Sequence, residues 1–117
     1  MSKETQRRPR RPQVPQVPQQ SQVPQRPIRI AMVGDYNPEF VAHTTADTSL
    51  RHVADALGVP VESAWIATPS ISEDAPERVF DDWDGIWISA GSPYRHRPGA
   101  LAAISYARER LRPMFAT

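Results

Sequence analysis

A short run of apolar residues, Ile28 to Val33, ends abruptly at Gly34-Asp35. Apart from Arg29 the run is continuously apolar, and it is rich in β-branched side chains. Strands buried on both faces have this pattern, whereas half-exposed strands alternate apolar and polar residues. The segment therefore predicts a buried strand.

Helical and strand-like segments alternate along the rest of the chain. Apolar residues recur at spacings of three and four between about Thr44 and Leu57, which indicates one face of a helix ending at Gly58. A second long helix is expected from Pro98, since proline is tolerated in a first helical turn. Further strands are expected over 61–67, 86–90 and 113–117. One helical turn is expected before Phe80, and the second helix is expected to end near 111.

This alternation fixes the expected fold class. Parallel strands need crossover helices, and right-handed crossovers place those helices on both faces of the sheet. We predict an α/β fold with an open parallel sheet and helices on both faces, truncated after the fourth strand. Because no helix follows 113–117 to cover that strand, residues 28–117 are expected to be the N-terminal half of a larger domain.

Residues 1–27 differ sharply from this body. They hold six of the thirteen prolines and seven glutamines, and Val-Pro-Gln recurs at 14–16, 17–19 and 23–25. Six basic residues and one acidic residue give the segment a charge of +5, which leaves −4 for residues 28–117 of a chain whose net charge is +1. We predict a disordered tail that favours polyproline II and is either a ligand for a proline-binding groove or a low-complexity extension. Its basic residues would also suit anionic surfaces, but the acidic body argues against nucleic acid as a partner of the domain.

Several classes of site and partner are not expected. No apolar run approaches the roughly 20 residues of a membrane span, and the basic N-terminus is not followed by the apolar core of a signal peptide. The 117 residues contain no cysteine, so they offer neither a disulfide, a thiolate metal site nor a cysteine nucleophile, and the expected compartment is the cytoplasm. His43 and His52 lack metal-ligand spacing and are expected to be solvated, as is Asp35 in its loop. We predict neither a metal nor a cofactor.

The loop from Gly91 to Gly99 is the most informative candidate site. In open α/β sheets, ligands bind beyond the carboxyl ends of the strands, and this loop follows the third strand. Glycine permits close backbone approach, so an N–H of the loop could face a developing oxyanion, and Arg95 to Arg97 make the loop electropositive. Ser92 lacks the Gly-x-Ser-x-Gly pattern of a nucleophile. An ordinary strand-to-helix turn with a basic rim would have the same composition.

Taken together, these segments resemble the class I glutamine amidotransferase family, and most closely the glutaminase half of CTP synthase and its stand-alone relatives. The resemblance implies that Gly91 and Ser92 supply oxyanion-hole N–H groups, that Tyr94 and Arg95 shape a glutamine pocket, and that the nucleophile directly follows Thr117. It covers the first half of the family domain, so the later His-Glu pair is absent, and it implies glutamine as the substrate of the parent domain. The residues that carry it are 30–36, 90–95, Gly99, 105–109 and 113–117.

Three functional hypotheses follow. The first is a truncated, CTP synthase-related glutaminase domain that is inactive as it stands. On this hypothesis the codon after Thr117 is expected to be UGA, encoding selenocysteine. Selenocysteine is ionised at neutral pH, which is the state that nucleophilic attack requires. The second is a non-catalytic α/β binding protein whose proline-rich tail recruits a partner. The third is a flavodoxin-like phosphate or nucleotide binder, although the loop after the first strand lacks a phosphate-binding glycine pattern.

Overall fold

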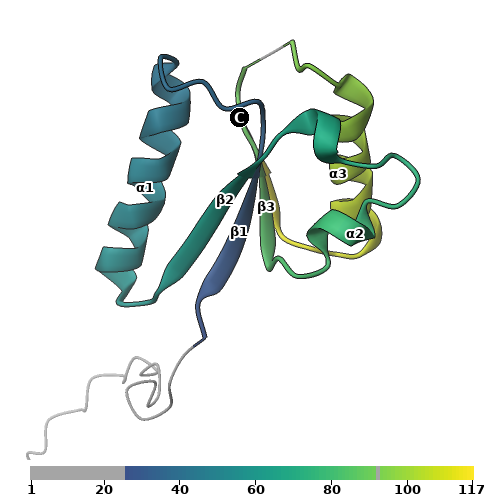
Figure 1. Ribbon diagram of the computed structural model, residues 1–117. Helices are drawn as coiled ribbons and strands as arrows, with labels where there is room; N and C mark the ends of the chain where they lie inside the picture. The colour runs from purple at the N-terminus through teal and green to yellow at the C-terminus, as the bar shows by residue number, and fades with distance from the viewer. Residues whose placement is uncertain (1–25, 92) are drawn as a thin grey trace, which may run out of the picture.

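A computed structural model describes residues 26–91 and 93–117 of the chain. Nearly all of the predicted tail, and Ser92, therefore lie outside the described residues. The described part forms one sheet with a long helix on one side and two helices on the other (Figure 1). This confirms the predicted α/β class.

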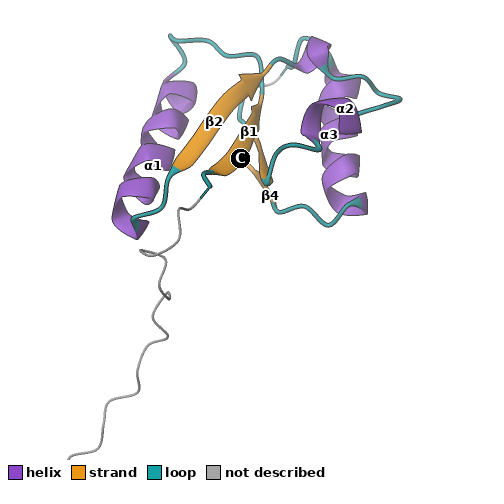
Figure 2. Cartoon of the chain, turned by 60° about the horizontal axis from the view of Figure 1, so that its bottom comes forward, coloured by secondary structure: helices purple, strands orange, loops and turns teal. Residues whose placement is uncertain are grey.

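All four strands are parallel and their order in the sheet is β2-β1-β3-β4. Strand β1 (Ile28–Val33) lies in the centre, between β2 (Val61–Ile66) and β3 (Gly85–Ile88), and β4 (Met114–Ala116) forms one edge (Figure 2). Paired Cα atoms join Ala31 to Ala64 on one side and to Ile86 on the other. Because these strands are parallel, the carboxyl ends of β1, β2 and β3 lie side by side, at what we call the carboxyl edge of the sheet.

Helix α1 (Val41–Leu57) begins three residues before the predicted start. The N–H groups of His43 and Thr44 bond to the carbonyl of Phe40, so the first turn forms without a side-chain cap. Its end is as predicted, because Gly58 adopts the left-handed conformation, with φ of 66°. The remaining helical elements are the 3₁₀ turn η2 (Thr68–Ser70), the short α2 (Glu77–Phe80) and α3 (Arg97–Glu109).

The main core lies between the sheet and the α2–α3 side. Alternate residues of β1 and β3 point to this side, as the pleat of a strand requires. They are joined by Phe80 of α2 and by one face of α3, and these side chains are almost fully buried. The cluster consists of Ala31, Val33, Ile71, Phe80, Ile86, Ile88, Ala103, Tyr106 and Ala107.

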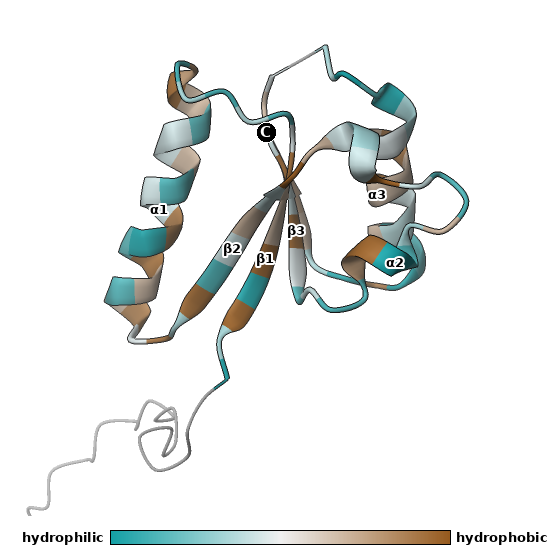
Figure 3. Cartoon of the chain, in the orientation of Figure 1, coloured by the Kyte–Doolittle hydropathy of each residue, from teal (hydrophilic) through white to brown (hydrophobic). Residues whose placement is uncertain are grey.

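The opposite side of the sheet carries α1 alone. Helix α1 packs on β2, while Met32 of β1 is fully buried and Trp65 of β2 donates its indole N–H to Asp47, 3.0 Å away. Towards β4 this side is open, and Phe115 is 57% exposed. Figure 3 shows apolar residues along the strands with α1 on one side and α2 and α3 on the other.

Candidate functional site

The segments that follow β1, β2 and β3 come together at the carboxyl edge of the sheet. Asp35 follows β1, Thr68 follows β2, and residues 89–96 connect β3 to α3. We refer to residues 89–96 as the β3–α3 loop. Two sets of hydrogen bonds hold this loop, one from each side of the sheet.

Asp35 binds the loop on the α3 side. Its carboxylate accepts hydrogen bonds from the Thr68 N–H at 2.9 Å, the Thr68 hydroxyl at 2.9 Å and the Arg95 N–H at 2.8 Å. The Thr68 oxygen in turn accepts from the N–H of His96, 2.9 Å away. The prediction that Asp35 is a solvated loop residue is therefore wrong: its carboxylate is half-buried and links three strand ends.

The hydrogen bonds to Asp35 stabilise its charge. Partial burial opposes ionisation of the carboxyl, but the N–H groups of Arg95 and Thr68 and the Thr68 hydroxyl outweigh it and lower the pKa of Asp35. The nearby Arg95 guanidinium acts in the same direction. Asp35 is consequently an ionised anchor at neutral pH.

His43 binds the loop from the α1 side. Its Nδ1 accepts the Asn37 N–H at 2.9 Å, which leaves the proton on Nε2 to be donated to the Ala90 carbonyl, also 2.9 Å away. The side chain is 3% exposed and lies among the rings of Tyr36, Phe40 and Trp65. The prediction that His43 is solvated is wrong, because the start of α1 turns the ring under the loop.

Gly91 lies directly above this histidine. Its φ is +123°, a conformation that side chains rarely adopt, and a Cβ built on it would lie 3.1 Å from the Nε2 of His43. Among residues 26–91 and 93–117, none accepts a hydrogen bond from the Gly91 N–H. The backbone of Gly91 therefore has an unusual conformation, and its N–H has no acceptor within the described part of the chain. The adjoining Ser92 lies outside the described residues.

The next two predicted residues differ in orientation. Tyr94 turns its ring back against the core and donates its hydroxyl to the Ser89 carbonyl at 2.7 Å. Burial and the charge of Asp35 raise the pKa of Tyr94, so the phenol stays neutral. Arg95 is exposed and is attached through its backbone N–H, which goes to Asp35. A cavity of about 390 Å³ lies between the Tyr94 ring and the start of α3.

The end of β4 adjoins the same loop. The Thr117 N–H donates to the carbonyl of Ile88 at 3.0 Å, one residue before Ser89 begins the loop. The end of β4 therefore lies next to the start of the β3–α3 loop.

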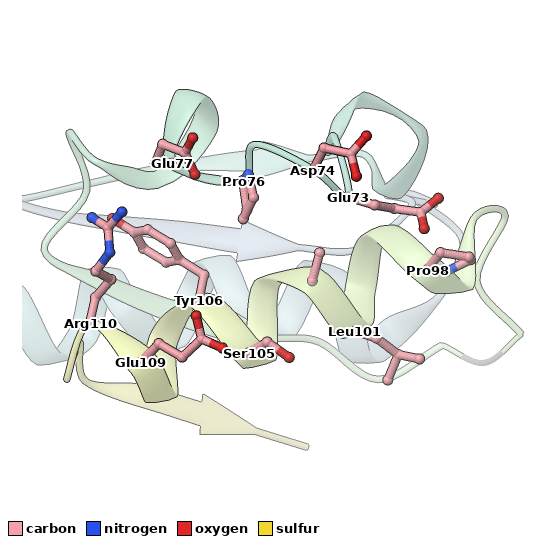
Figure 4. A pocket seen from close by; sticks show the side chains of 11 residues that line it. Glu73, Asp74, Pro76, Glu77, Pro98, Leu101, Ser105, Tyr106, Glu109 and Arg110 are labelled. Atoms are coloured by element: carbon pink, nitrogen blue, oxygen red, sulfur yellow. The ribbon is translucent and has the colours of Figure 1, made fainter.

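A separate cavity of about 470 Å³ lies between α3 and residues 73–77 (Figure 4). Carboxylates of Glu73, Asp74, Glu77 and Glu109 surround it, and none of the predicted site residues lines it. Within the described ranges, no three His, Cys, Asp or Glu side chains are grouped so as to hold a metal ion. The described helices also include none that is long and apolar enough to cross a membrane.

Sequence comparison identifies relatives of this chain. The CTP synthase of Acaryochloris marina is 35% identical over 104 residues, which cover 89% of this chain and 19% of that protein. The chain is related to CTP synthase. The CTP synthases of Synechococcus sp. (strain JA-3-3Ab) and Staphylococcus epidermidis are 35% and 34% identical, over 71% and 75% of this chain.

The relationship to CTP synthase concerns a limited segment. The chain spans between 15% and 19% of the length of these three CTP synthases. No family model matches the sequence, and no solved structure matches it.

Proposed function

We propose that residues 28–117 form the oxyanion side of a glutamine-hydrolysing site in a CTP synthase-related amidotransferase domain. In this proposal the N–H groups of Gly91 and Ser92 bind the oxygen of the glutamine side-chain amide. The observation that carries it is Gly91 itself, in a chain related to CTP synthase: its φ is +123°, His43 bonds to the preceding carbonyl, and no acceptor for its N–H is found among residues 26–91 and 93–117.

The chemistry requires charge stabilisation at this point. A nucleophile that attacks the amide carbon of glutamine converts the carbonyl oxygen into an oxyanion, and ammonia leaves as the tetrahedral intermediate collapses to a thioester or selenoester. Water then releases glutamate. Backbone N–H groups fixed before the reaction stabilise the oxyanion without reorganisation, and loss of one such donor typically lowers kcat by about 10²–10³-fold.

The anchors of the β3–α3 loop support this role. His43 and Asp35 bond to it from the two sides of the sheet, at the Ala90 carbonyl and at the Arg95 N–H. The nucleophile is proposed to follow Thr117, and this is supported by the bond from the Thr117 N–H to the carbonyl of Ile88, the residue directly before the loop. The identity of that nucleophile as selenocysteine stays a prediction, and sequencing the codon after Thr117 tests it.

Titration of the isotope-labelled chain with L-glutamine tests the binding step. We expect amide shifts confined to residues 90–96, weaker shifts with L-asparagine, and no ammonia release by the 117 residues alone. Gly91→Ala adds a Cβ beside His43 and should abolish the shifts. The matched control is Gly58→Ala, a second left-handed glycine at the far end of α1 with no neighbour within 4 Å of its Cβ position.

Three results would refute the proposal: equal shifts with both amino acids, shifts that survive in Gly91→Ala, or turnover by the 117 residues. Where the gene encodes family residues beyond codon 117, the extended protein offers a second test. There Gly91→Ala should lower kcat by about 100-fold or more, with a smaller change in KM. A chain that unfolds cooperatively, is monodisperse and ignores glutamine would instead support the non-catalytic binding protein.

A further inference from the structure

The peptide group between Ala90 and Gly91 links the ring of His43 to the N–H of Gly91. Its carbonyl oxygen, which belongs to Ala90, accepts the Nε2–H of His43 at 2.9 Å. A peptide group is planar and almost always trans, so its C=O and its N–H point in opposite directions. The N–H of Gly91 therefore points away from the His43 ring, and a bond that holds the Ala90 carbonyl also sets the direction of this N–H.

Local sterics do not fix the orientation of this peptide. A half-turn of its plane would take the φ of Gly91 from +123° to about −57°, a value that every residue type adopts. Glycine has no Cβ and tolerates both values, so both directions of the N–H are open to the backbone. The observed orientation is the one that turns the Ala90 carbonyl towards His43. A hydrogen bond to that carbonyl therefore selects between the two.

The His43 ring is itself fixed by the segment that leads into α1. Its Nδ1 accepts the N–H of Asn37 at 2.9 Å, and the backbone N–H of His43 bonds to the Phe40 carbonyl in the first turn of the helix. Because the backbone N–H only donates and the carbonyl only accepts, the two ring nitrogens have defined roles. The side chain is buried, so water competes little for either bond. The ring is thus a donor of fixed position and direction.

A second donor reaches the same carbonyl. The hydroxyl of Ser89 bonds to the Ala90 oxygen at 3.1 Å. This bond is longer and joins neighbouring residues, whereas the bond from His43 joins the loop to α1 across 47 positions of the sequence. A hydroxyl also rotates to suit its acceptor, so it follows the carbonyl. His43 is therefore the donor that relates this peptide to the rest of the fold.

We propose that His43 is a positioning residue, which holds the Ala90–Gly91 peptide so that the Gly91 N–H is directed at the oxygen of the glutamine amide. The inference rests on the proposed function, in which that N–H is an oxyanion donor. A donor of this kind is effective because its direction is set before the reaction begins. His43 acts through the peptide plane and touches neither glutamine nor the nucleophile. Loss of its Nε2–H frees the peptide to turn, which takes the N–H away from the substrate.

Two replacements separate the two hydrogen bonds of the ring. In His43→Gln the side-chain amide nitrogen takes the place of Nε2, so it keeps a donor for the Ala90 carbonyl. In His43→Asn the shorter side chain puts its oxygen in the place of Nδ1, so it keeps the bond from Asn37 and loses the one to Ala90. Both variants lose the imidazole ring. A role in packing alone would therefore make the two variants alike.

The couplings between the amide proton of Gly91 and its two α protons measure the orientation without any ligand. At a φ of +123° one coupling is large and the other small, whereas the turned peptide gives two of intermediate size. We expect the first pattern in the parent chain and in His43→Gln, and a shift towards the second in His43→Asn. Titration with L-glutamine should show binding about 5-fold weaker in His43→Asn than in His43→Gln, the effect of one lost hydrogen bond.

Ser89→Ala is the matched control, because it removes the longer bond to the same carbonyl and keeps the ring; it should retain the parent couplings. The proposal is overturned by intermediate couplings in the parent chain, by parent couplings in His43→Asn, or by the same change in both His43 variants. A change in Ser89→Ala alone would assign the plane to Ser89 instead. If the parent chain does not bind glutamine, the proposed function fails, and the couplings still decide whether His43 sets the peptide plane.

Discussion

The two sides of the sheet use the same strands but are packed very differently. On the α3 side, Phe80 and Tyr106 close a core in which every member is nearly inaccessible to water. On the α1 side, a single helix covers β1 and β2, and Phe115 of β4 is more than half exposed. Within the described residues, the free energy of folding therefore comes mainly from the α3 side.

The largest expected effect tests this asymmetry directly. Phe80→Ala removes a fully buried ring and should lower the free energy of unfolding by about 3–5 kcal/mol. Phe115→Ala is the matched control on the opposite side, and about 1 kcal/mol or less is expected because the ring is largely exposed. Chemical denaturation of both variants measures the difference. Equal losses would show that the two sides contribute equally.

Asp35→Asn tests the α3-side anchor of the β3–α3 loop. Replacing a carboxylate that accepts three hydrogen bonds should cost about 1.5–3 kcal/mol at neutral pH. Because the pKa of Asp35 is lower in the folded chain than in the unfolded chain, its contribution is present above about pH 4 and is lost as pH falls through the folded-state value.

Unfolding measured from neutral to acid pH should therefore show the parent and Asp35→Asn converging at low pH. Asp84→Asn is the comparison at the other end of the sheet. The pKa of Asp84 is also lowered, chiefly by Arg26, so this variant should likewise converge with the parent at low pH. A constant difference between the parent and Asp35→Asn across the range would contradict the assigned role.

His43→Leu tests the α1-side anchor and carries the smallest expected loss. The variant keeps apolar contact with the surrounding rings but leaves the Asn37 N–H and the Ala90 carbonyl to water, at a cost of about 1–2 kcal/mol. Hydrogen exchange of the β3–α3 loop should increase more than exchange in α3. His52→Leu, on an exposed face of α1, should change neither quantity.

Local pattern was sufficient to predict most of the elements. The apolar run from Ile28 to Val33 coincides with β1, and Gly58 ends α1 as expected. The other strands and α3 lie within about two residues of their predicted limits, because their periodicity depends only on neighbouring residues. Helix α1 starts earlier than predicted because its first turn is set by the Phe40 carbonyl and not by a capping side chain.

The arrangement of the site was less accessible to sequence reasoning. The glycine of the β3–α3 loop was singled out from its place after a strand; its φ is +123°, and its role in binding an oxyanion stays a prediction. The contacts of Asp35 with Arg95, and of His43 with Ala90, join residues 60 and 47 positions apart. No local pattern encodes such pairs, since they exist only once the parallel strands have brought their carboxyl ends together.

The sheet order also bears on the timing of folding during synthesis. Strand β1 is made first yet occupies the centre of the sheet, and its second partner, β3, is made only when residues 85–88 appear. One edge of β1 therefore has no partner while the whole of α1, β2 and α2 is produced. Contacts of such high sequence separation slow folding, so the nascent chain exposes one edge of this largely apolar strand while residues 34–84 are made.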